Sequence, residues 1–151
     1  MIPKRILFCT DFSENSEPAR QVALDYAKTF GAGLIIVHVV NPAHLGYPSL
    51  EDLPLSEVQL KTVEERLEKS LATMAEECRK TVPDVTTQLS KGVPSSEIVK
   101  VGNEWEVDLI VMGTHGWSGL SHILVGSTAE NVVRSAHRPV LTVWTCRPQC
   151  T

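Results

Sequence analysis

The sequence lacks the features that mark several large classes of protein. Its 4 cysteines among 151 residues include no Cys-x-x-Cys pair, and the close pair Cys146 and Cys150 has no partners for a zinc site. No apolar run approaches the ~18 residues of a membrane span, and the stretch before Cys9 is too short for the core of a secretory signal. Lys and Arg total 14 against 18 Asp and Glu, which argues against a dedicated nucleic-acid binder. We therefore expect a cytoplasmic protein with reduced cysteines that binds neither nucleic acid nor a membrane.

What the sequence does contain is the composition of a globular domain. Hydrophobic residues make up 42% and charged residues 21%, and folding at this length buries roughly 68–70% of the extended chain's surface. The sequence shows neither an internal repeat nor a low-complexity stretch. It therefore predicts a single domain over residues 1–151, with residues 145–151 as a flexible tail.

Short apolar runs of the β type alternate with segments of helical periodicity. We expect strands at residues 4–9, 34–40, 85–90, 107–112 and 140–144. The first helix is expected to bury one stripe of Ala19, Val22, Ala23, Tyr26, Ala27 and Phe30, and the last helix a stripe of Ala129, Val132, Val133 and Ala136. Such alternation requires right-handed crossovers between parallel strands. The sequence thus predicts an α/β fold in which a single open, mostly parallel five-stranded sheet carries helices on both faces.

Polar and glycine-rich segments follow two of the expected strands. In open parallel sheets, ligands bind beyond the carboxyl ends of strands whose connections leave in opposite directions. Asp11 follows the first strand, and a glycine-rich segment at 113–128 follows the fourth. Its last residues, Gly126-Ser127-Thr128, open a helix whose free N–H groups favour an anion. The segment is neither a Walker loop nor a Gly-x-Gly-x-x-Gly loop nor an esterase elbow.

The spacing Gly113-x2-Gly116-x9-Gly126-Ser127 resembles the nucleotide-binding signature of the universal stress protein family. The similarity extends over nearly the whole chain, through residues 6–13, 37–39, 108–116, 126–133 and 138–143. The resemblance implies a Rossmann-like sheet of strand order 3-2-1-4-5 and an ATP-binding member of the family. It also implies a homodimer in which Val140–Trp144 pairs with the same strand of a second copy.

The resemblance further implies which residues contact the nucleotide. The adenine and ribose would be lined by Thr10, Asp11, Val39, Met112 and Gly113. The phosphates would be held by His115, Gly116, Gly126, Ser127 and Thr128. Trp117 and His122 stand where many relatives carry Arg or Lys, so ADP and AMP are expected as ligands beside ATP, with Mg²⁺ as an optional companion.

Several of these residues have a second interpretation. Asp11 also fits a helix N-cap of the Asp11-x-x-Glu14 type. His115 fits either a phosphate contact or a scaffold for its loop. His38, in the middle of an expected strand, is interpreted as a structural histidine whose hydrogen bonds are satisfied.

Three functions remain open at this stage. The first is an adenine-nucleotide-binding sensor or regulator of the stress response, acting on an unidentified protein partner. The second is a slow ATP hydrolase or phosphotransferase, and the third is a dimeric interaction module with a vestigial nucleotide site. Phosphoryl transfer needs charge stabilisation and a positioned nucleophile. The phosphate end of this sequence has neither a P-loop lysine nor a carboxylate cluster, so the sensor or regulator is favoured.

Overall fold

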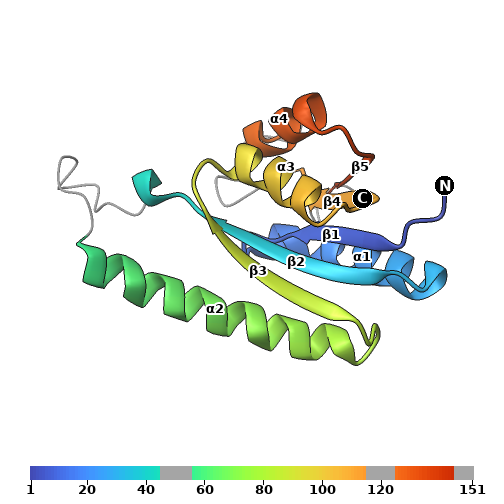
Figure 1. The fold of residues 1–151 in the computed structure, drawn as a ribbon, viewed down its shortest axis with the longest axis horizontal. Helices are drawn as coiled ribbons and strands as arrows, with labels where there is room; N and C mark the ends of the chain where they lie inside the picture. Colours follow the sequence, from blue (N-terminus) through green and yellow to red (C-terminus); the bar gives the residue numbers. More distant parts are fainter. Residues whose placement is uncertain (45–55, 115–124, 145–151) are drawn as a thin grey trace, which may run out of the picture.

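Strands and helices alternate along the chain as the sequence predicts (Figure 1). The computed structural model describes residues 1–44, 56–114 and 125–144. The strands are β1 (Arg5–Cys9), β2 (Gly33–Val40), β3 (Val85–Lys91), β4 (Leu109–Gly113) and β5 (Val140–Val143). The helices are α1 (Glu17–Phe30), α2 (Glu57–Arg79), α3 (Pro94–Glu104) and α4 (Ser127–Ser135), with short 3-10 turns η1 (Glu14–Ser16) and η2 (Pro42–His44).

The strands form one parallel sheet in the order β3-β2-β1-β4-β5. This confirms the predicted fold class and the strand order that the resemblance implied. α1 and α2 cover one face of the sheet, and α3 and α4 cover the other (Figure 1). β1 lies at the centre, so its side chains reach both layers. Ile6 and Phe8 pack toward α1 and α2, whereas Leu7 and Cys9 pack toward α3 and α4.

Local sequence signals explain where the helices begin and end. α1 ends at Gly31, whose φ of 65° is a left-handed conformation that glycine adopts without strain. Ser56 is the N-cap of α2 and forms a capping box, in which the Ser56 side chain accepts from the Gln59 N–H and the Gln59 side chain accepts from the Ser56 N–H. Within the described residues, no helix has the length and hydrophobicity to cross a bilayer.

The predicted apolar stripes of two helices are wrong in part. Tyr26 and Phe30 are 39% and 41% exposed, and their rings pack against each other edge to face. Leu24 is buried instead, together with Ala19, Ala23 and Ala27, and the two large rings lie outside this buried face. In α4, Val133 is 52% exposed. Periodicity finds the helix, but the width of its buried face depends on how closely it approaches the sheet.

Six strand ends differ from the prediction by one or two residues, among them the start of β4 and the end of β5. β4 begins at Leu109 because the Val107 N–H donates to the Gly102 carbonyl (3.0 Å) and so closes the end of α3. β5 ends at Val143, one residue before Trp144, which is 47% exposed. These differences fall within the usual uncertainty of element ends.

Candidate functional site

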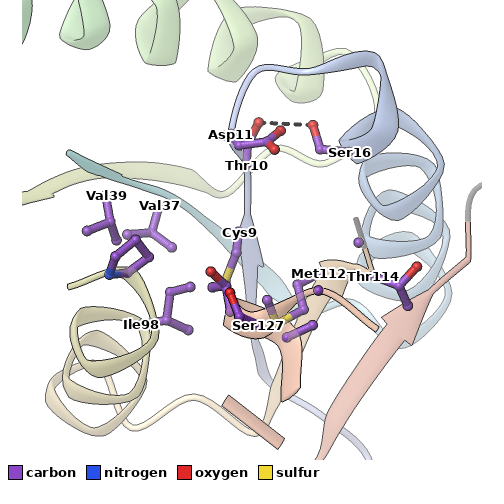
Figure 2. A pocket seen from close by; sticks show the side chains of 15 residues that line it. Cys9, Thr10, Asp11, Ser16, Val37, Val39, Ile98, Met112, Thr114 and Ser127 are labelled. Atoms are coloured by element: carbon purple, nitrogen blue, oxygen red, sulfur yellow. Dashed lines mark hydrogen bonds between the residues drawn. The ribbon is translucent and has the colours of Figure 1, made fainter. Parts of the chain in front are cut away.

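The switch point of the sheet lies between β1 and β4. The chain leaves β1 toward β2 and leaves β4 toward β5, so the two connections diverge and open a crevice at the carboxyl ends of these strands. A cavity of about 180 Å³ lies at this position (Figure 2). It is lined by Cys9, Thr10, Asp11, Ser16, Val37, Val39, Pro94, Ile98, Met112, Gly113, Thr114, Gly126, Ser127, Thr128 and Ala129.

The topology brings together at this cavity every described residue that the family resemblance implied as a nucleotide contact. The residues in this set are Thr10, Asp11, Val39, Met112, Gly113, Gly126, Ser127 and Thr128. They come from the turn after β1, from β2 and β4, and from the start of α4, so only the fold makes them neighbours. His115 and Gly116 lie outside the described residues, as do Trp117 and His122.

The turn after β1 forms one wall of the cavity. The Phe12 N–H donates to the Thr10 hydroxyl (3.0 Å), and the Thr10 hydroxyl in turn lies 3.3 Å from the Ser16 hydroxyl (Figure 2). The N–H and the hydroxyl of Ser13 both donate to the Asp11 carboxylate (2.9 and 2.5 Å). Phe12 adopts a φ of 62°, a conformation that is costly for a large side chain.

The structure decides against one interpretation of Asp11. The residue at the N-cap of η1 is Ser13, and the residue at the N-cap of α1 is Ser16. The interpretation of Asp11 as the helix N-cap is therefore wrong. The Asp11 carboxylate closes a short turn and remains part of the cavity wall.

His38 lies behind this wall and is hydrogen-bonded, as predicted. Its Nδ1 lies 2.8 Å from the Thr10 carbonyl oxygen, and because a carbonyl can only accept, Nδ1 carries the proton. Its ring packs against Phe12, with the ring centroids 4.7 Å apart. Burial lowers the pKa of His38, although the bond to Thr10 and the charge of Asp11 act in the opposite direction.

This pKa shift predicts how stability depends on pH. The unfolded chain takes up a proton on His38 near pH ~6.5, whereas the folded protein does so only at lower pH. The contribution of His38 to stability is therefore complete above pH ~6.5 and is lost as the pH falls through the folded-state pKa. We expect the melting temperature to fall further between pH 7.5 and pH 5 in the wild type than in His38→Asn. Equal falls in the two proteins would contradict the assignment.

The opposite wall is the start of α4. Gly126 occupies the N-cap without a side-chain cap, and its own N–H donates to the Thr114 carbonyl (2.6 Å). The first N–H groups of a helix have no partner inside it, and together with the helix dipole they favour an anion. Ser127 and Thr128 add hydroxyl groups at the same edge. This end of the cavity is thus suited to a phosphate.

The described lining of the cavity contains few charged or reactive side chains. Asp11 is the one charged side chain among the described residues that line it. Burial strongly raises the pKa of the Cys9 thiol, which disfavours the reactive thiolate. Among the described residues, no cluster of three or more His, Cys, Asp or Glu side chains could hold a metal ion.

Sequence reasoning missed several residues of the cavity. Val37 lies two positions before Val39 on the same face of β2, so alternation along the strand could have found it. Pro94 and Ile98 have the i, i+4 spacing of one helix face at the start of α3. Cys9 and Thr114 flank the predicted residues Thr10 and Gly113 at the ends of their strands.

Comparison with known proteins identifies the family. The model described as "Universal stress protein family" matches residues 3–143. The chain belongs to the universal stress protein family. The universal stress protein MJ0531 of Methanocaldococcus jannaschii is 38% identical over 141 residues, which cover 93% of this chain and 81% of that protein. The universal stress protein MJ0577 of the same organism is 34% identical over an alignment 156 positions long, which covers 93% of this chain and 94% of that protein.

A solved universal stress protein shows the same fold. The structure of UspA from Lactobacillus plantarum superposes with a TM-score of 0.77 at 25% identity, covering 93% of this chain and 97% of that one. The likeness therefore extends over nearly all of this universal stress protein. The family identified from the glycine spacing and the flanking strands is confirmed.

Proposed function

We propose that this chain is a cytoplasmic, adenine-nucleotide-binding stress-response protein that acts as a sensor or regulator. The observation that carries the proposal is the cavity at the switch point. It joins a carboxylate on one wall, Asp11, to the start of a helix on the other, Gly126–Thr128. These two walls suit the two ends of a nucleotide, a hydroxyl-bearing sugar and an anionic phosphate.

Each part of the ligand has a matching part of the wall. The ribose hydroxyls donate to the Asp11 carboxylate, which as an ion can only accept. The adenine ring lies against the apolar side chains of β2 and β4 and faces the backbone of Val39. The phosphates lie at Gly126, Ser127 and Thr128, with His115 and Gly116 as further contacts. ATP, ADP and AMP share these groups, and any Mg²⁺ is carried by the phosphate oxygens.

Two solved proteins of the same fold support an adenine nucleotide as the ligand class. One universal stress protein was solved in complex with cAMP (TM-score 0.72, 23% identity), and one from Archaeoglobus fulgidus in complex with dAMP (TM-score 0.65, 22% identity). At these identities the likeness is one of fold. The case for this chain therefore rests on the residues of its own cavity.

Nucleotide retained during purification tests the proposal. Protein denatured after purification should release an adenine nucleotide, identified by its ultraviolet absorbance and its retention in ion-exchange chromatography. Protein stripped of nucleotide should rebind AMP or ATP in calorimetry, and GMP should bind more weakly. A stripped, folded protein that binds none of the three would contradict the proposal. Phosphate released from ATP over several hours would show hydrolysis in addition to binding.

We further propose a homodimer through Val140–Trp144. β5 is an edge strand whose residues are all half-buried, and an exposed apolar edge is a liability unless it is paired or covered. Light scattering at micromolar concentration should report a dimer. Thr142→Lys should shift the mass toward the monomer, because like charges would meet across a two-fold axis.

A matched substitution controls for the added charge. Thr73 is exposed on α2, away from the β5 edge, so Thr73→Lys should leave the dimer intact. A monomeric wild type would contradict the proposed interface.

A further inference from the structure

We propose that His38 is a positioning residue for nucleotide binding: its imidazole donates to the Thr10 carbonyl where the pairing of β1 with β2 ends, and so holds the Thr10–Asp11 turn at the cavity wall while the Val39 backbone N–H faces the base. This inference rests on the proposed function. It concerns a side chain that lies on the face of the sheet opposite the cavity. Val37 and Val39 line the cavity, and His38 between them points to the other face, where it meets Phe12.

The direction of the backbone groups of β2 follows from the hydrogen bonds. The Gly33 N–H donates to the Lys4 carbonyl (2.9 Å), and the Val37 carbonyl accepts from the Thr10 N–H (3.0 Å), so odd-numbered residues of β2 face β1. Even-numbered residues face β3, since the Leu34 N–H donates to Asp84 (2.9 Å). The N–H and carbonyl of Val39 therefore point past the end of β1, toward the crevice.

The pairing of β1 with β2 ends at Cys9 and Val37. If the parallel ladder continued by one step, the Thr10 carbonyl would accept from the Val39 N–H. Instead, Nδ1 of His38 reaches this carbonyl at 2.8 Å. The side chain thus substitutes for a backbone donor at the point where the ladder stops. The consequence is that a donor and an acceptor of Val39 are presented together at the cavity, the pair that the edge of a base recognises.

His38 also supports the strained turn. Phe12, with its φ of 62°, packs against the imidazole in a tilted arrangement, with the ring planes inclined at 46°. The turn is therefore held at two points, the carbonyl of Thr10 and the ring of Phe12. A left-handed conformation of a large residue persists only where its surroundings hold it. Because the same turn carries Asp11, its position determines where the carboxylate meets a ribose.

The surroundings of His38 indicate that it acts through its Nδ1–H donor and not through a positive charge on the ring. Asp11 faces it from the turn, and Leu89 is its partner on β3. Lys91 is two residues after Leu89 and therefore lies on the same face of β3. It forms an ion pair with Glu64 of α2 (2.5 Å). Burial lowers the pKa of His38, so at neutral pH the ring is uncharged with its proton on Nδ1.

Two substitutions separate the donor from the packing. Asn places an amide N–H close to the position of Nδ1, whereas Leu fills similar space without a donor. We expect His38→Leu to raise the Kd for AMP about tenfold or more, equivalent to about 1.4 kcal/mol. The Kd of His38→Asn for AMP should stay within about threefold of the wild-type value, because the amide keeps a donor near the position of Nδ1. Leu89→Ala controls for lost packing beside His38: it should lower the melting temperature and leave the Kd unchanged.

The outcomes distinguish this inference from the proposed function. If the wild type binds no adenine nucleotide, the proposed function fails. If the wild type binds AMP, and His38→Leu and His38→Asn bind it equally well, the positioning role fails while the proposed function stands. Should His38→Leu not fold, nitrogen NMR of the wild type decides. We expect a proton on Nδ1 of His38 and a shifted Val39 amide on addition of AMP, whereas a proton on Nε2 alone would overturn the inference.

Discussion

Gly126→Val is expected to weaken AMP binding about a hundredfold or more while the protein stays folded, at about 1.4 kcal/mol per tenfold. Gly126 lies at the N-cap of α4, with a φ of −58° and a ψ of 151° that a branched residue also adopts. The substitution therefore does not strain the backbone. It places a branched side chain at the first N–H groups of the helix, where the proposed function puts the phosphates.

Calorimetry with stripped protein measures this effect. Val125→Ala serves as the neighbouring control, because Val125 is 41% exposed and does not line the cavity. This variant should bind AMP as the wild type does. A folded Gly126→Val that keeps its affinity would contradict the placement of the phosphates at α4.

Phe8→Ala is expected to lower the free energy of unfolding by about 3–5 kcal/mol. Phe8 is 0% exposed in the central strand, between the sheet and the α1–α2 layer. Its loss leaves a cavity that a rigid sheet cannot close. Because the ring packs toward α1 and α2, away from the side chains of β2 and α3 that line the cavity, variants that remain folded should bind AMP with nearly the wild-type Kd.

Phe30→Ala provides the matched control for the same chemical change. Phe30 is 41% exposed at the flank of α1, so its truncation should cost less than about 1 kcal/mol. Urea denaturation of both variants measures the difference. Equal losses of stability would contradict the layer arrangement derived from the burial of these two rings.

The contrast between these two phenylalanines shows which parts of the fold can be predicted from the sequence. Phe8 lies in a continuous apolar run, which predicts a strand covered on both faces, and it is fully buried. Phe30 continues an apolar stripe of the right period, yet the buried face of α1 consists of three alanines and Leu24, and the ring of Phe30 lies outside it. Periodicity predicts elements and their order. The depth of burial depends on tertiary distances that a single sequence does not contain.

The candidate site, too, could be predicted from the sequence only in part. The position of a site after β1 and β4 follows from the topology alone, which is why Asp11 and Gly126 were found from the sequence. The role of His38 at this site was not found, although a satisfied histidine was predicted. Its contact with Thr10 depends on the register of β1 against β2 and on the residue at which their pairing stops. Neither quantity has a signature in the amino-acid pattern.

The most direct test of the central claim is an amide-proton NMR titration of the stripped protein with AMP. The account predicts that the largest shifts fall on the two walls of the cavity, at Asp11 and Val39 on one side and at Gly113, Gly126 and Ser127 on the other. Amides on the exposed face of α2, remote from the switch point, should not move. Saturating AMP that shifts no amide, or shifts only amides away from the ends of β1 and β4, would contradict the claim that this cavity binds an adenine nucleotide.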